Sequence, residues 1–318
     1  MIRQFACLFV LVSAAAFAPL AQGAIVARFA AVDGSVSVRD AKGANRPAEV
    51  FGSVSTDDTL VLADGASVSL AWLADSRLER VSKPGETKIT ATGVEPPDNS
   101  EVIQVAQKHR KLVASGVRAL PTISPGAATI ARSSEDKPVF PKITPISGAT
   151  VLEPAPTFSW PEVKSAEKYV LRVLLNVDEI WSSESTKPTL LYAGEELEAG
   201  IAYRWEVKAQ VPGKPEQTLV SAEFSIATPG QLQEVKDLKE LAESQKKEVA
   251  VLALVAMRFE QHRMIAEATR IYEQLAQLTP KTAAFHAALV DLYKRAGRQD
   301  EAKKAQAAAE KLGFVFAE

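Results

Sequence analysis

Apolar and polar residues alternate through the first part of the chain, from residue 24 to residue 94. In the clearest run, Val68, Leu70 and Trp72 alternate with serine or alanine. Such a period of two places one row of side chains in a core and the other in water, which predicts half-buried strands. Two Asp-Gly pairs lie between the apolar runs, where turns are needed: Asp33-Gly34 and Asp64-Gly65. This region is predicted to be all-β.

Between residues 95 and 148 this alternation is lost. The apolar positions from Glu101 to Ser115 predict a short helix. Beyond it, prolines recur among glycines and serines: Pro121, Pro125, Pro138, Pro141 and Pro145. Because proline lacks a backbone donor and disfavours helix in the residue before it, these residues predict an extended linker that separates two modules.

A cleaner alternation returns between residues 149 and 228, where Tyr203, Trp205 and Val207 alternate with charged residues. Five or more short strands follow at regular spacing, with turns such as Pro212-Gly213. This pattern predicts a two-sheet β-sandwich.

From residue 229 to residue 318 the apolar period is helical. Phe259 and Tyr293 lie 34 residues apart, and so do Ala268 and Ala302. A fixed period of this length is typical of arrays of helical hairpins.

Two full units can be counted, at 249–282 and 283–316, with Pro280 at the end of the first. The helix predicted at Gln231–Lys246 has no partner helix, because the preceding residues belong to a strand. Arrays need about three units for stability. We therefore expect the two helical units to be stabilised by packing against this half-repeat and against the sandwich.

Residues 1–23 have the composition of a secretory signal peptide. Arg3 is followed by the apolar run Phe5–Ala18, and small residues precede a cleavage site near Gly23. The run is shorter than a membrane-spanning helix. The single cysteine, Cys7, would be removed, so the mature chain is predicted to have no disulfide, no transmembrane span and a periplasmic or secreted location.

Part of the first β region resembles the FecR domain, a periplasmic β module of iron-dicitrate signal regulators and of many secreted proteins. The resemblance is carried by three stretches: Gly34–Arg39, Ala66–Trp72 and Asp75–Leu78. The family usually has Gly-Asp where Asp57-Asp58 stands, and Asp75-Ser76 lacks the glycine of its usual Asp-Gly pair. The regulators' membrane span and anti-sigma segment have no counterpart in the sequence, so no sigma-factor relay is expected.

The other two regions also resemble known modules. Residues 149–228 are similar to the fibronectin type III-like sandwich, in the stretches Pro156–Trp160, Ala166–Val173 and Leu197–Trp205. The helical units resemble the tetratricopeptide repeat, with an alanine at the helix crossing, an aromatic beside it and a closing proline. Arg263 departs from this pattern, because its counterpart 34 residues later is Gly297.

Composition argues against catalysis and nucleic-acid binding. The formal net charge is −2, and the longest basic run is Lys108–Lys111. His109, His262 and His286 have no metal-ligand spacing, and neither a nucleophile elbow nor a phosphate-binding loop occurs. We expect no metal, no cofactor and no enzymatic activity.

Two functions are compatible with this organisation. The first is a non-catalytic scaffold of the cell envelope, whose helical repeats bind a protein or peptide in a groove lined by Arg258, Lys294 and Arg298. The alternative is a module that binds carbohydrate or peptidoglycan. Its aromatic platform would be Trp181, because Trp160 and Trp205 are predicted to be core residues.

Overall fold

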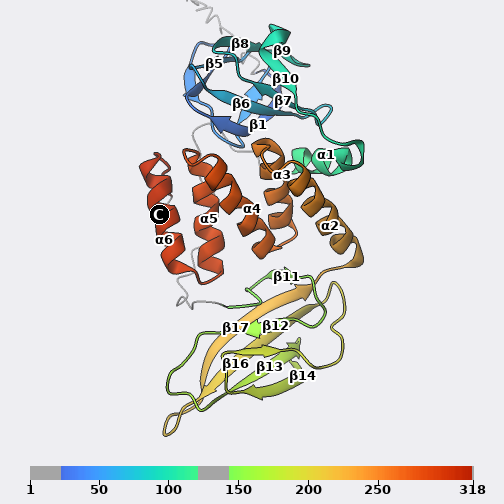
Figure 1. The fold of residues 1–318 in the computed structure, drawn as a ribbon, viewed down its shortest axis with the longest axis vertical. Helices are drawn as coiled ribbons and strands as arrows, with labels where there is room; N and C mark the ends of the chain where they lie inside the picture. Colours follow the sequence, from blue (N-terminus) through green and yellow to red (C-terminus); the bar gives the residue numbers. More distant parts are fainter. Residues whose placement is uncertain (1–22, 121–142, 317–318) are drawn as a thin grey trace, which may run out of the picture.

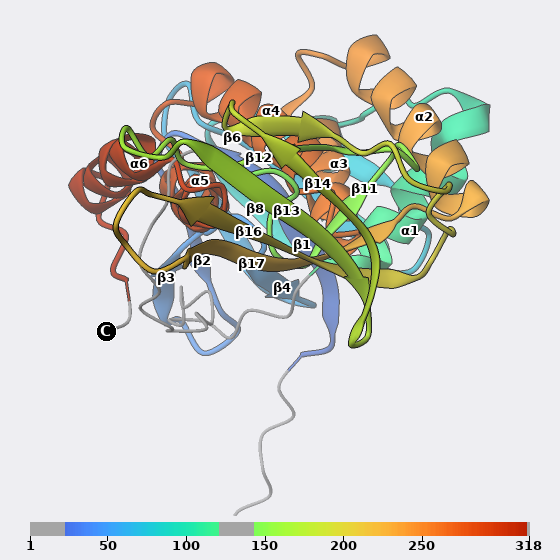
Figure 2. The same ribbon diagram turned by 90° about the horizontal axis from the view of Figure 1, so that it is seen from below.

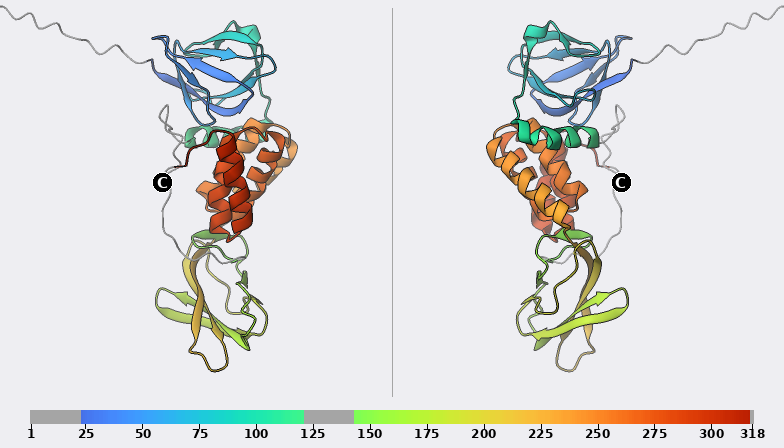
Figure 3. Two further views of the ribbon diagram at one scale, coloured as in Figure 1. Left: turned by 90° about the vertical axis from the view of Figure 1, so that its left-hand side faces the viewer. Right: turned by 90° about the vertical axis from the view of Figure 1, so that its right-hand side faces the viewer.

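The computed structural model describes residues 23–120 and 143–316. Except for Gly23, the predicted signal peptide lies outside these residues, as does much of the predicted linker. Three bodies are stacked along the long axis of the molecule (Figure 1). The helices come last in the chain, yet they lie between the N-terminal β domain and the β-sandwich (Figures 1 and 3).

Two five-stranded sheets form the N-terminal β domain. The first has the order β10(Ser100–Val102), β7(Leu78–Val81), β6(Ser67–Trp72), β1(Ile25–Asp33) and β4(Ser53–Ser55). The second has the order β3(Asn45–Pro47), β2(Val36–Arg39), β5(Thr59–Leu62), β8(Gly85–Ile89) and β9(Val94–Glu95). Phe29, Leu60, Leu70 and Trp72 fill the core between them.

One row of β6 departs from the predicted alternation. Ser69 and Ala71 were predicted to face water, but both are buried. The reason is that helix α3(Val249–Gln261) lies against β1 on this sheet. Ala30 of β1 and Ala71 belong to the same apolar cluster as the helices. Their small side chains allow the helix to approach closely.

The prediction of a helix at Glu101–Ser115 was wrong in its bounds. Residues 100–102 form strand β10, which pairs with β7, and helix α1 spans Arg110–Ala119. The apolar stripe of α1 contains Val113 and Val117, both buried in the cluster shared with the helices. Gly116 lies directly against Leu254 of α3, since a Cβ there would be 3.2 Å from that of Leu254. These residues are therefore part of the packed structure.

The second β region is a β-sandwich, as predicted. One sheet has the order β11(Ala149–Val151), β17(Gln217–Ile226), β16(Ala202–Gln210), β13(Lys168–Leu175) and β14(Asp178–Ser185). The other pairs β12(Thr157–Ser159) with β15(Thr189–Leu191). Trp160 and Trp205 are buried, which confirms their assignment to the core.

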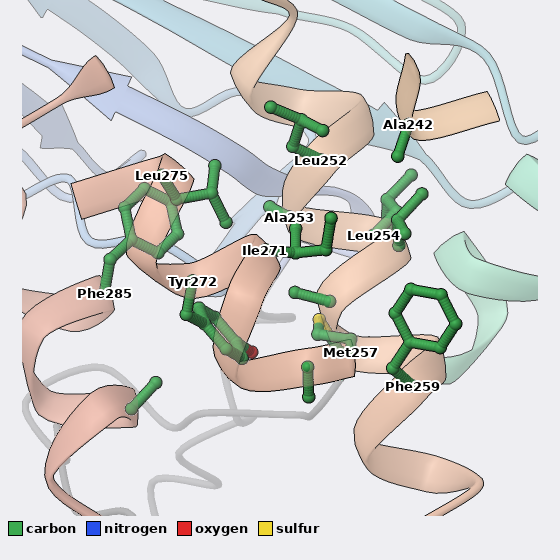
Figure 4. Packing of buried hydrophobic residues seen from close by; sticks show 14 of the residues in the cluster. Ala242, Leu252, Ala253, Leu254, Met257, Phe259, Ile271, Tyr272, Leu275 and Phe285 are labelled. Carbon is green, nitrogen blue, oxygen red and sulfur yellow. The ribbon is translucent and has the colours of Figure 1, made fainter. Parts of the chain in front are cut away.

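Five helices form the layer between the β bodies: α2(Pro229–Ser244), α3(Val249–Gln261), α4(Ile265–Leu278), α5(Ala283–Arg295) and α6(Gln299–Lys311). The first residues of α3 and α5 are 34 positions apart, and so are those of α4 and α6. Tyr272 and Phe285 pack with residues of α3 in the core of the layer (Figure 4). The period seen in the sequence is therefore also the period of the helices.

Among the described residues, five that are not glycine have a positive φ: Phe51, Asp57, Ser76, Asn176 and Arg263. Asp57 and Ser76 have φ of 70° and 61°. Arg263 has φ of 56°, and its repeat counterpart Gly297 has φ of 70°. A side chain in this left-handed region costs about 1 kcal/mol.

Replacing Arg263 by glycine should therefore raise the free energy of unfolding, by about 1 kcal/mol, because its exposed side chain leaves no cavity. Gly297→Ala should lower the same quantity by a similar amount. Urea denaturation of both variants tests the pair. A destabilised Arg263→Gly protein would contradict the expectation.

Candidate functional site

The surface of α3 that the sequence assigned to a partner groove is filled by the protein itself. Eight consecutive residues, Ala250–Met257, are buried, although an exposed helix would leave one side polar. The main contacts of α3 are with α1, α2, α4 and β1. Arg80 of β7 also donates two hydrogen bonds to Glu248, at 2.5 and 2.6 Å. A partner therefore cannot reach most of this helix.

The equivalent surface of the second repeat is open at the C-terminal half of α5. Met257 is only 6% exposed, whereas its counterpart Asp291 is exposed, as are Lys294 and Arg295. Lys294 is thus the one exposed member of the three predicted groove cations. This half of α5 is the part of the predicted groove that a partner can reach.

Arg258 is engaged in a cluster that joins α2 to α3. Its Nε lies 3.0 Å from Glu234 Oε1, and His262 Nε2 lies 3.0 Å from Glu234 Oε2. Burial opposes ionisation of Glu234, but Arg258 and His262 outweigh it and hold the pKa of this carboxyl below its ordinary value. The cluster fastens the half-repeat helix to the first full repeat.

This cluster predicts a pH dependence. A carboxyl with a lowered pKa in the folded state stabilises the protein above its unfolded pKa of about 4.3, and that contribution is lost as pH falls through the folded value. Between pH 6 and pH 3, the native protein should lose on the order of 1 kcal/mol more than Glu234→Gln. Glu243→Gln, in the same helix and exposed, is the control. Equal losses in all three proteins, measured by urea denaturation, would contradict the assignment.

Arg298 is held in a second cluster, between α4 and α6. Its Nη1 lies 3.0 Å from Glu273 Oε1, and its guanidinium lies 4.4 Å from the ring centre of Tyr293. The Tyr293 hydroxyl donates to the same Glu273 at 2.8 Å, and burial together with this carboxylate raises the pKa of Tyr293 to about 12. The structure thus gives Arg258 and Arg298 separate internal partners. The sequence did not identify Glu234 and Glu273 as the partners of these arginines, since no local motif marks an ion pair between residues that are distant in sequence.

Trp181, the predicted sugar-binding residue, is partly buried. Its ring centre lies 4.9 Å from that of Tyr192, at an interplanar angle of 58°. Gly194 lies against the same pair, since a Cβ there would be 2.9 Å from Trp181 Cδ1. The indole therefore contributes to the sandwich core and does not stand out as a flat platform.

A polar hollow of about 400 Å³ lies at one side of the N-terminal β domain, beside Arg77, Glu79 and Ser100. Glu79 is buried, and it accepts hydrogen bonds from Arg77 at 3.1 Å and from Ser100. The acid is thus satisfied by its neighbours. Within residues 23–120 and 143–316, no three His, Cys, Asp or Glu side chains are grouped to hold a metal ion.

The basic run Lys108–Lys111 does not form a continuous cationic surface. Lys108 pairs with Glu240 of α2, and His109 is buried at the start of α1. Among the described helices, none is both long and apolar enough to cross a membrane.

Comparison with known proteins gives weak structural similarity. No protein-family model matches the sequence. No curated protein is significantly similar to it. The fibronectin III domain of human collagen α-1(XX) is 20% identical over 31% of this chain and 96% of that one, with a TM-score of 0.23. The FN1–FN3 domains of chicken CNTN1 are 12% identical over 64% of this chain and 57% of that one, with a TM-score of 0.22. A β-1,2-glucanase from Parabacteroides distasonis is 10% identical over 92% of this chain and 49% of that one, with a TM-score of 0.20.

Proposed function

We propose that this protein is a non-catalytic scaffold of the cell envelope, exported to the periplasm and built from FecR-like, fibronectin III-like and tetratricopeptide-like modules. The observation that carries the proposal is a single apolar cluster that joins all three bodies. It contains Ala30 and Leu78 of the β domain, Val117 of α1, Leu254 of α3 and Ala149 of the sandwich. Such a core holds the modules in one fixed arrangement.

Several contacts support rigidity at both ends of the helical layer. The pair between Arg80 and Glu248 ties the β domain to α3. At the other end, the backbone N–H of Thr150 in the sandwich donates to the carbonyl of Arg263 at 2.9 Å. A rigid body with binding modules at fixed distances suits a scaffold, whereas a flexible chain of modules would not need these contacts.

Three of the five positive φ values at non-glycine residues support the family resemblances within the proposal. Asp57 and Ser76 adopt the conformation that the glycines of the FecR pattern favour, and Arg263 does the same for its repeat counterpart Gly297. A partner protein would contact the open half of α5, around Asp291, Lys294 and Arg295. Lysine and arginine at this surface favour an acidic partner segment.

The proposal is tested in the producing cells with a photo-crosslinking residue at position 294, and with the same residue at Lys214, exposed in the sandwich, as the control. We expect one envelope protein to be captured from position 294 and not from 214, and the mature chain to begin after Gly23 in the periplasmic fraction. Equal capture at both positions, or a cytoplasmic chain that retains Met1, would overturn it.

A further inference from the structure

The strand β14 forms an unusually long open edge. Within the described sheets, the other edge strands have two or three residues: β3, β4, β9, β10, β11, β12 and β15. β14 has eight residues, with a bulge at Ile180, and among the described residues it pairs only with β13 (Figure 2). Natural proteins keep edge strands short because the unpaired N–H and C=O groups bind other strands. The bulge interrupts β14, but Trp181–Ser185 still pairs in regular register over five residues, longer than any other described edge strand.

The opposite edge of the same sheet is closed. There the N–H of Thr150 in β11 donates to Arg263 of the helical layer. β14 lies at the far side of the sheet from β11 (Figure 1). One edge of the sandwich is thus used to attach the module, and the other is left available.

The side chains of β14 indicate the charge of a binding partner. The strand carries Asp178, Glu179 and Glu184 and has no lysine or arginine. Glu184 pairs with Lys168 at 2.6 Å and Glu179 with Arg172 at 3.3 Å, both on β13. A carboxylate has further acceptor positions beyond one such contact. These acids can therefore also receive a cation from the open side.

The rest of the module reinforces this charge. Residues 149–228 contain twelve Asp or Glu and seven Lys or Arg, a formal charge of 7 − 12 = −5, while the whole chain has −2. The edge also offers apolar contacts, since Val177 and Ile180 are 82% and 42% exposed. Three serines, Ser182, Ser183 and Ser185, leave the backbone accessible between the acids.

We propose that β14 binds an extended, lysine- or arginine-containing segment of another protein, which adds a strand to the sandwich sheet. Main-chain hydrogen bonds would supply the affinity, and pairing with Glu179 and Glu184 would select the charge. A second copy of this chain fits less well, because two β14 strands side by side would bring like charges together. This surface is separate from the α5 surface of the proposed function, so either can fail alone.

Amide hydrogen exchange of the full chain tests the proposal with an acetylated and amidated eight-residue peptide of alternating lysine and valine. We expect outward-facing amides of β14 to become at least about tenfold more protected, and the effect to weaken at high salt. The same peptide with glutamate in place of lysine is the charge control. No protection, equal protection by both peptides, or protection that grows with protein concentration alone would overturn the proposal.

A pair of proline variants adds an internal control. Neighbouring N–H groups of an edge strand point alternately toward the sheet and away from it, so Ser182→Pro and Ser183→Pro remove one donor of each kind. We expect one variant to keep native stability and lose peptide protection, while the other loses stability. If the stable variant is protected as fully as the native protein, the peptide does not pair with β14 and the inference is wrong.

Discussion

Val117→Asp is expected to lower the free energy of unfolding by about 3–5 kcal/mol, because it places an unpaired carboxylate in the shared core. Val117 has 0% exposure and packs in the same cluster as α3. Burying a charge without a partner is among the most destabilising changes that one residue can make. Guanidinium denaturation, followed by far-ultraviolet circular dichroism, measures the loss.

Lys111→Asp is the matched control, since Lys111 lies in the first turn of the same helix and is exposed. Its effect should stay within about 0.5 kcal/mol, because an acid near a helix N-terminus is favourable. If Val117→Asp were as mild as Lys111→Asp, α1 would not be packed against the helical layer. A large difference assigns α1 to the folded body.

The sequence predicts the types of element well where the pattern is set by one module alone. Tyr203, Trp205 and Val207 are buried as their alternation implies, and the helices keep the 34-residue period of Phe259 and Tyr293. In both cases the residues that bury each other lie within the same module. Local periodicity is then sufficient to identify the buried face.

The contacts between modules could not be predicted in this way. Ser69 and Ala71 carry no signal that a helix from a distant part of the chain covers them, and the strand β10 is too short to give a period. The acids that bind the guanidinium groups of Arg258 and Arg298 are 24 and 25 residues away in sequence. Because such partners are set by the packing of whole modules, the predicted groove contained cations that the fold uses internally.

The C-terminal tail illustrates the same limit. The sequence leaves open whether Phe314–Phe316 covers the last helix or binds a partner. In the structure, Phe316 packs on the shared cluster and the rings of Phe314 and Phe316 lie 4.8 Å apart, while Val315 is 76% exposed. The tail thus covers part of the helical layer and presents one apolar side chain outward.

Met257→Asp should lower the free energy of unfolding by about 3–5 kcal/mol. The size of this loss reports whether the α3 side of the predicted groove is buried in solution. Met257 is buried among residues of the helical core (Figure 4). Its repeat counterpart 34 residues later is already an aspartate, and Asp291 is exposed. The same side chain at equivalent positions therefore meets a buried environment in α3 and solvent in α5.

The reciprocal change, Asp291→Met, is the control and should alter stability by less than about 0.5 kcal/mol. Thermal and urea unfolding of both variants give the comparison. If Met257→Asp is tolerated as well as Asp291→Met, the first repeat is open in solution and a partner could bind along both helices. If only Met257→Asp destabilises the protein, this part of α3 stays buried in solution, and a ligand of the helical layer is restricted to α5.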